Sequence, residues 1–204
     1  MTRLTRLLAS FLVLIGLAQA PAQGQDFGPP QAEALTETIV EEMLVFIDSD
    51  MSLEGKVSEF QKLLLKRADM PTIARFTLGV TWRTTSEAQQ TAYKAAFDGY
   101  IANKYGRQFT RFDNQTIDIV SSFDAGRRGI VVMTEFDQKD GSEPIRVEWQ
   151  YSDRSGSPKL VDLIVEGVSL LSSERQEIGA KLERYNGNVD RLIEDLENTS
   201  LRAS

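Results

Sequence analysis

Two carboxylates, Asp162 and Glu166, stand four residues apart in a run rich in β-forming residues, and they are the strongest candidates for acid–base chemistry. Four residues along an extended strand separate two Cα atoms by about 13 Å. The paired carboxyl groups of inverting glycosidases lie only about 6.5–9.5 Å apart, so this spacing argues against joint action on one bond. We therefore expect each carboxylate to pair with a cation or to cap a loop, with Arg175 as a candidate partner.

The composition excludes most other kinds of catalytic site, because the 204 residues include no Cys and no His. Disulfides, thiol nucleophiles, Ser-His-Asp triads and zinc sites with Cys or His ligands are thereby excluded. A Mg²⁺ or Ca²⁺ site built only from carboxylates is still compatible with the sequence. The segment Asp137–Asp140 has part of the spacing of a calcium loop but lacks the downstream glutamate, so it favours a hairpin turn. We expect no enzymatic activity, no cofactor and no bound metal.

Large apolar side chains gather at helical spacing in residues 86–105 and at alternating positions in residues 145–151. The helical stripe contains Tyr93, Phe97, Tyr100, Ile101 and Tyr105. The predicted strand carries Val147, Trp149 and Tyr151 on one face. Both surfaces fit an ordinary protein core, and both also fit the wall of a cavity that holds an apolar ligand.

The first 22 residues have the pattern of a secretory signal peptide. Arg3 and Arg6 give a positive start, residues 7–17 are apolar, and small residues precede an expected cleavage after Ala22. Removal of residues 1–22 takes away two of the 23 basic residues and none of the 30 acidic ones, which changes the formal charge from −7 to −9. Such an acidic chain is a poor partner for nucleic acid or for anionic lipid surfaces. We expect an exported, soluble protein that begins with a flexible segment at 23–32.

The rest of the sequence changes from helical to strand periodicity after about residue 110. Apolar stripes and end signals predict helices at 32–48, 53–67, 69–79, 86–105, 173–185 and 188–197. Alternation predicts strands at 115–123, 129–136, 145–151 and 159–166, with short turns that imply antiparallel pairing. The sequence thus predicts a single α+β domain at 33–197, with helices packed on one face of a curved, mainly antiparallel four-stranded sheet, and a disordered tail at 198–204.

Local signals refine three of these elements. Thr84 and Glu87 have capping-box spacing before the helix at 86–105. In the last strand, alternation predicts a core face made of Val161, Leu163 and Val165. The opposite face then carries Leu160, Asp162, Ile164 and Glu166. Gly167 ends that strand, and Ser172 or Ser173 is expected to cap the helix that follows.

Three segments of the chain follow one another in a recognisable order. One is the run V-D-x-x-V-E-G-V-S-L at 161–170, followed by Arg175. The others are D-M-P-T-I-A-R-F-T-L-G-V-T-W-R at Asp69–Arg83 and the segment Tyr105–Thr116, which ends in N-Q-T. Together they resemble the MlaC family, the periplasmic lipid-binding components of a bacterial ABC-type lipid transport system. Two positions depart from the family, since Pro158 and Glu174 stand where aromatic residues are common.

The resemblance implies a cystatin-like fold and a periplasmic carrier that moves a phospholipid between the outer and inner membranes, which maintains outer-membrane lipid asymmetry. It also implies two partners, a substrate-binding domain of the inner-membrane ABC complex and an outer-membrane lipoprotein–porin assembly. The chain itself has no phosphate-binding loop, so energy would come from the ABC complex. Three alternatives stay open: a carrier of a hopanoid or another apolar ligand, a periplasmic adaptor that binds only proteins, and a carboxylate-based hydrolase.

The predicted lipid site lies between the helix at 86–105 and the apolar face of the sheet. About 30 methylene groups at about 0.8 kcal/mol each represent on the order of 24 kcal/mol of apolar exposure, so a soluble carrier must enclose the acyl chains. The best candidates for the lining are Phe97, Tyr100, Ile101, Trp149, Leu163 and Val165. The full predicted set adds Phe76, Trp82, Tyr93, Tyr105, Val132, Val147, Tyr151, Val161 and Val168.

Overall fold

The computed structural model describes residues 27–109, 117–138 and 141–202. The predicted signal peptide, its cleavage site and residues 23–26 lie outside these ranges. The described helices are α1 (Pro29–Ile47), α2 (Leu53–Arg67), α3 (Met70–Leu78), α4 (Glu87–Phe109), α5 (Leu170–Arg184) and α6 (Val189–Arg202). The strands are β1 (Ile117–Asp124), β2 (Ile130–Phe136), β3 (Ile145–Ser152), β4 (Lys159–Val165) and β5 (Val168–Ser169). Among the described helices, none combines the length and the apolar character that a membrane span needs.

The sheet is an antiparallel meander in the order β1-β2-β3-β4-β5. This confirms the predicted α+β class, but the sheet has five strands where four were expected. The additional strand, β5, turns back on β4 through Glu166 and Gly167, whose φ angles of 47° and 79° are both positive. Two consecutive residues with positive φ make the tight hairpin turn that matches the twist of paired strands. The sequence-based prediction therefore missed only a two-residue strand.

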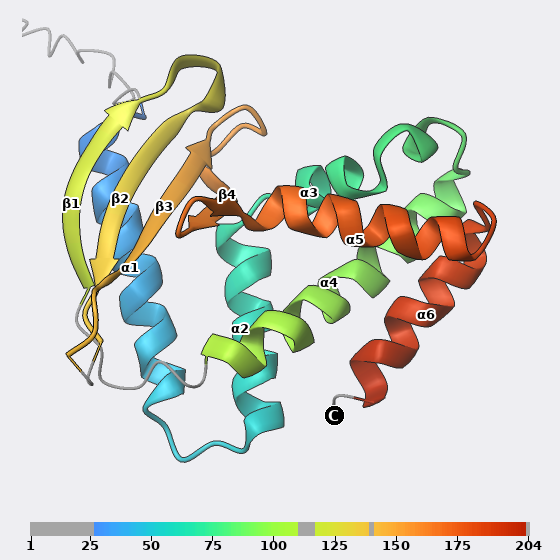
Figure 1. Ribbon diagram of the computed structural model, residues 1–204, viewed down its shortest axis with the longest axis horizontal. Coiled ribbons are helices and arrows are strands. Elements are labelled where there is room, and N and C mark those ends of the chain that lie inside the picture. Colours follow the sequence, from blue (N-terminus) through green and yellow to red (C-terminus); the bar gives the residue numbers. More distant parts are fainter. Residues whose placement is uncertain (1–26, 110–116, 139–140, 203–204) are drawn as a thin grey trace, which may run out of the picture.

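The helices divide between the two ends of the molecule (Figure 1). α1 lies against β1 and β2, whereas α3, α4, α5 and α6 gather beyond β4 at the other end, with α2 between the two groups. α4 packs on α2, α3 and α6. The expectation that the helix at 86–105 packs directly on the sheet is therefore wrong, because α2 occupies the position between α4 and the strands.

A β-bulge changes which side chains of β4 face the interior. Gln150 pairs with Asp162 and Tyr151 pairs with Leu160, so Val161 is an extra residue without a partner in β3. The bulge reverses the alternation, and Leu160 lies on the same inner side as Leu163. The prediction that these two leucines occupy opposite faces is therefore wrong.

Three helix ends differ from their predictions for local reasons. The capping box of α4 uses Ser86 and Gln89, because the Gln89 amide donates to the Ser86 hydroxyl and the Ser86 amide donates to the Gln89 side chain. α5 begins at Leu170, and its cap is Ser169, whose hydroxyl accepts from the Ser172 amide at 3.0 Å. α6 continues to Arg202, through residues predicted to form a disordered tail.

The start of the domain also differs from its prediction. α1 begins at Pro29, inside the segment 23–32 that was expected to be flexible. Pro29 and Pro30 occupy the first turn, where a missing backbone N–H breaks no hydrogen bond and the fixed φ angle favours the helix. The two prolines therefore start the helix, although they suggested an irregular segment.

Asp98 on α4 is expected to make the stability of the domain depend on pH. Its Oδ1 atom is buried without a hydrogen-bond partner among the described residues. Burial raises the pKa of Asp98 to about 6, although Lys94 acts to lower it. The folded state therefore keeps this proton up to a higher pH than the unfolded state, so the contribution of Asp98 to stability falls as pH rises from about 4 through about 6.

The substitution Asp98→Asn removes the buried charge without changing the shape of the side chain. After allowance for partial solvent screening, we expect it to raise the free energy of unfolding by about 1–2 kcal/mol near pH 7 and by almost nothing near pH 4. Urea denaturation at the two pH values measures the difference. Asp118→Asn, at an exposed position of β1, is the matched control. An equal gain at both pH values would contradict the prediction.

Candidate functional site

Two apolar cavities adjoin one another between the helices and the inner face of the sheet. The first has a volume of about 80 Å³, and the second has a volume of about 70 Å³. Their linings share five residues from α2, β4 and the α2–α3 connection: Phe60, Leu64, Ala68, Leu160 and Leu163. These shared residues form the wall between the cavities, so movement of their side chains would join the two spaces.

The first cavity lies on the helical side of this shared wall. Besides the shared residues, its lining comprises Met70, Ile73, Ile101, Tyr105, Val161, Asp162, Leu170, Leu171 and Glu174. These residues come from α3, α4, β4 and α5, so segments from both halves of the chain enclose one space. The lining is apolar except at Tyr105, Asp162 and Glu174.

The second cavity lies between α1, α2 and the sheet. Its other lining residues are Ile39, Met43, Leu63, Arg67, Phe136, Val147, Trp149 and Val165. Trp149 pairs with Leu163 across β3 and β4, and Val147 pairs with Val165, so these four side chains form two rows on the inner face. The Trp149 indole N–H donates to the Thr134 hydroxyl at 2.9 Å, which satisfies the polar group of this buried ring.

The C-terminal end of α2 is tied to both the sheet and α1. The Asp69 amide donates to the Leu160 carbonyl at 2.9 Å, and Ala68 forms a parallel bridge with Leu160. Arg67 donates two hydrogen bonds to the Glu42 carboxylate on α1. These bonds from Arg67 are the main reason why the pKa of Glu42 falls to about 2. The end of α2 that borders both cavities is therefore fixed to its neighbours.

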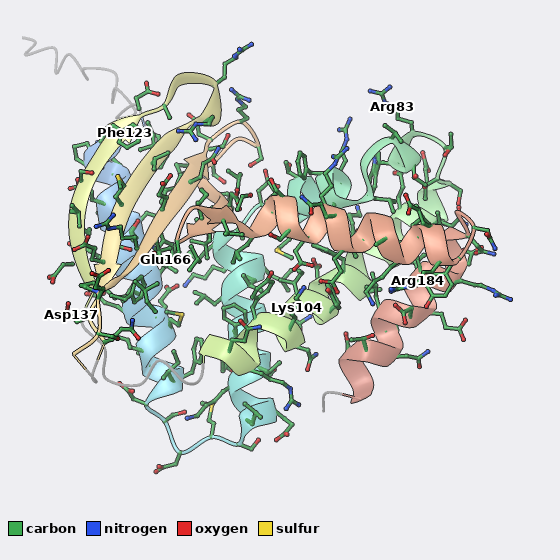
Figure 2. The ribbon with its side chains drawn as sticks, in the orientation of Figure 1. Arg83, Lys104, Phe123, Asp137, Glu166 and Arg184 are labelled. Atoms are coloured by element: carbon green, nitrogen blue, oxygen red, sulfur yellow. The ribbon has the colours of Figure 1, made fainter. Side chains whose placement is uncertain are left out.

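A network of polar side chains connects the first cavity with solvent. Lys104 on α4, which Figure 2 labels, donates to Glu174 at 2.6 Å and to Glu177, both on α5. The Tyr105 hydroxyl donates to Glu174 at 2.5 Å. The Tyr100 hydroxyl donates to Glu177 at 2.8 Å. The Glu174 side chain is 4% exposed and that of Glu177 is 43% exposed. The network therefore leads from the cavity wall to the protein surface.

Both tyrosines of this network act as hydrogen-bond donors. Burial raises the pKa of Tyr105, and its hydrogen bond to Glu174 raises it further. Burial also raises the pKa of Tyr100, and the charge of Glu174 adds to the effect. Both phenols therefore keep their protons at neutral pH, and each stabilises a carboxylate.

The two carboxylates with possible catalytic roles each cap a loop. Asp162 accepts from the Leu171 amide at 2.9 Å and from the Ser169 hydroxyl at 2.6 Å, which ties β4 to the start of α5. Glu166 accepts from the Arg146 amide at the end of β4. Burial raises the pKa of Asp162, and the hydrogen bonds to its carboxylate oppose this effect. These contacts hold the β4–α5 connection in place.

The expected partnership of Arg175 with Asp162 or Glu166 is wrong. The Arg175 guanidinium donates to the Phe76 carbonyl at 2.7 Å and lies 4.7 Å from the centre of the Phe76 ring. Within the described ranges, no group of three or more carboxylates is arranged to hold a metal ion.

The fold brings about half of the predicted lining residues to the two cavities. Those that line one or both are Ile101, Tyr105, Val147, Trp149, Val161, Leu163 and Val165. Those that line neither are Phe76, Trp82, Tyr93, Phe97, Tyr100, Val132, Tyr151 and Val168. Phe97 and Tyr100 were among the six best candidates and line neither cavity, whereas Ile101 on the same helix lines the first.

The predicted residues that line neither cavity make other contacts in the fold. Tyr93 stacks on Phe97 with ring centres 5.7 Å apart, and its hydroxyl bonds Thr77 of α3. The Tyr151 hydroxyl bonds Thr36 of α1 at 2.7 Å, in the core beneath that helix. Val132 is buried in the same core, and Val168 is 57% exposed in β5. Phe76 and Trp82 line a hollow at the surface with Arg75, Arg83 and Arg175.

Sequence reasoning missed the contribution of α2 and α3. Phe60, Leu64, Met70 and Ile73 all line the first cavity, and the apolar stripe of α2 was visible in the sequence. The aromatic content of residues 86–105 directed attention to α4, although aliphatic side chains make an equally good wall. The sequence shows Glu174 only as a departure from an expected aromatic residue, because its partner Lys104 is 70 residues away.

Comparisons with known proteins agree with this architecture. The family model described as MlaC protein matches residues 37–198. A Haemophilus influenzae protein named intermembrane phospholipid transport system binding protein MlaC is 30% identical over 97 residues. That match covers 46% of this chain and 45% of the relative, so the chain spans less than half the length of the curated relative.

A solved structure shares the fold. It is the phospholipid-binding protein from Ralstonia solanacearum in complex with a phospholipid, with a TM-score of 0.70 and 21% sequence identity. The similarity covers 84% of this chain and 98% of that one. The resemblance seen in the sequence is confirmed, and because the family model matches most of its length, the chain belongs to the MlaC family.

Proposed function

We propose that this protein carries a phospholipid through the periplasm as the soluble component of an ABC-type lipid transport system, and so helps to maintain outer-membrane lipid asymmetry. The observation that carries the proposal is the pair of adjoining apolar cavities with a polar network at one end. Acyl chains fit the apolar part, and a head group fits the end where Lys104 and Glu177 reach solvent. Membership of the MlaC family and the phospholipid-bound neighbour support the same function.

The cavities are too small for a phospholipid in the conformation described. Each is smaller than the roughly 150 Å³ apolar cavity that accommodates benzene, and two acyl chains need several times that space. Lipid binding therefore requires the shared wall to move. Phe60 and Leu64 lie on α2 and Leu163 lies on β4, so movement of these side chains and of the part of α2 before its tie to Leu160 would admit an acyl chain without loss of the strand pairing in the sheet.

A carrier role requires no chemical step, and the carboxylates at the site have structural hydrogen bonds. Asp162 and Glu174 accept hydrogen bonds from their neighbours, and the chain contains no Cys or His nucleophile or base. Transfer instead requires docking to proteins that deliver and receive the lipid. For these roles we propose a substrate-binding domain of the inner-membrane ABC complex and an outer-membrane lipoprotein–porin assembly, the partners that the family implies.

Lipid analysis of the native protein tests the proposal. We expect protein purified from a bacterial periplasm without detergent to release phospholipid in a stoichiometric amount on organic extraction. Mass spectrometry identifies the molecule, and the release of a hopanoid instead would change the assigned cargo. Addition of phospholipid to delipidated protein should also raise its melting temperature with increasing lipid concentration. A folded protein that neither contains nor is stabilised by lipid would support the adaptor alternative.

A further inference from the structure

One carboxylate oxygen at the first cavity has no hydrogen-bond partner among the described residues. Glu174 is 3% exposed, and its Oε1 atom accepts from Lys104 and Tyr105. Its Oε2 atom is buried and unpaired within the part of the chain that the structure describes. A buried acceptor without a donor has lost the hydrogen bonds that water would give it, and the loss is greater for a charged group, so this oxygen is expected to meet a donor in the loaded protein.

The other polar groups of the first cavity are already occupied. Both oxygens of Asp162 accept hydrogen bonds, from Leu171 and from Ser169. The Tyr105 hydroxyl donates to the Oε1 atom of Glu174. The remaining lining residues are apolar. The described lining residues therefore supply no donor for Oε2, which leaves a bound ligand or an internal water to supply it.

The charges around this oxygen favour a donor with positive charge. Glu174 and Glu177 share the single ammonium of Lys104, and Asp162 also lines the cavity. Lys181 is close to the ring of Tyr100, but it pairs with Asp195 at 2.8 Å. Carboxylates therefore outnumber the cations available to them, and a ligand ammonium would reduce this imbalance.

We propose that Glu174 binds the primary ammonium of a lipid head group, so that the protein prefers amine-bearing phospholipids. This inference rests on the proposed carrier function and adds a head-group preference to it. A primary ammonium has N–H donors for Oε2, whereas the quaternary ammonium of a choline head group has none. With the head group at Glu174, the acyl chains extend toward the wall of Phe60 and Leu163 and then toward the inner face of the sheet.

A competition between two lipids with the same acyl chains tests the preference. Delipidated protein is equilibrated with liposomes of equal parts phosphatidylethanolamine and phosphatidylcholine, and the bound lipid is measured by mass spectrometry. We expect about tenfold or greater enrichment of phosphatidylethanolamine in the wild type, as a charged hydrogen bond predicts, and a ratio close to that of the liposomes in Glu174→Gln. In that variant the side-chain carbonyl oxygen can still accept from Lys104 and Tyr105, while an NH₂ group replaces the free acceptor.

Glu183→Gln is the matched control, because Glu183 is an exposed glutamate of the same helix and lines neither cavity. We expect this variant to keep the wild-type enrichment, and thermal melting curves check that both variants fold. Wild-type protein that binds both lipids equally would overturn the inference and leave the carrier function intact, with an internal water as the donor. Enrichment that survives in Glu174→Gln would also overturn it. A wild type that binds no lipid would instead overturn the carrier function itself.

Discussion

The substitution Leu163→Trp is expected to lower the phospholipid content of the purified protein by about tenfold or more, because the indole fills the space that an acyl chain must cross. Leu163 lines both cavities, so one larger side chain can occupy free volume on either side of the shared wall. The indole replaces empty space in the lipid-free protein, so we expect its melting temperature to stay similar or to rise. Lipid extraction and a melting curve of the same sample measure both effects.

Ile164→Trp provides the control for this experiment. Ile164 is the next residue of β4 and lines a hollow on the outer face of the sheet, with Arg146 and Glu148. The variant carries the same added ring on the same strand, and we expect its lipid content to match the wild type. If Leu163 belongs to an ordinary close-packed core, Leu163→Trp should instead lose about 1–3 kcal/mol of stability and keep its lipid. That result would show that the shared wall is not on the lipid path.

Phe60→Ala is expected to lower the free energy of unfolding of the lipid-free protein by about 3–5 kcal/mol, the range for removal of a buried aromatic ring. Phe60 is 6% exposed, lines both cavities and packs against Gly106 of α4. Its removal joins the cavities into one larger apolar space. An acyl chain in that space replaces part of the lost contact, so we expect added phospholipid to stabilise Phe60→Ala more than it stabilises the wild type.

Urea denaturation of delipidated protein, with and without added phospholipid, measures both parts of this expectation. Leu65→Ala is the control, because Leu65 lies on the exposed side of α2 with 52% of its surface accessible. We expect Leu65→Ala to cost little and to respond to lipid as the wild type does. Equal stabilisation of Phe60→Ala and the wild type by lipid would show that the ring is not part of the lipid path.

Periodicity was enough to predict most of the fold, because each element has a clear apolar face and clear ends. Residues 53–67 form α2 at the predicted bounds, and the long strands lie within a few residues of their predicted positions. The additional residue at Val161 was not predictable, since a bulge leaves the composition of a strand unchanged and only alters its pairing. That one residue decides whether Leu160 faces the cavities or the solvent.

The candidate site was harder to predict, because an apolar stripe shows that a helix packs but not what it packs against. The stripe of α4 divides its residues: Ile101 and Tyr105 reach the first cavity, whereas Tyr93 and Phe97 pack within the helical half. Glu174 illustrates a second limit. Its importance depends on a missing donor, and hydrogen-bond partners that are far apart in sequence become visible only after the chain is folded.

The backbone link between Ala68 and Leu160 fixes the C-terminal end of α2 and leaves its N-terminal end without such a link to the sheet. The Asp69–Leu160 hydrogen bond holds the C-terminal end of the helix on β4, so we expect lipid entry to displace α2 mainly toward its N-terminal end. The 15 residues of α2 give an arm of about 22 Å, and a swing of about 15° moves its far end by on the order of 6 Å. Phe60, near the middle of the arm, moves about half as far, while the strand ladder of the sheet stays closed. A small rotation about the C-terminal end of α2 would thus open a wide gap beside its N-terminal end.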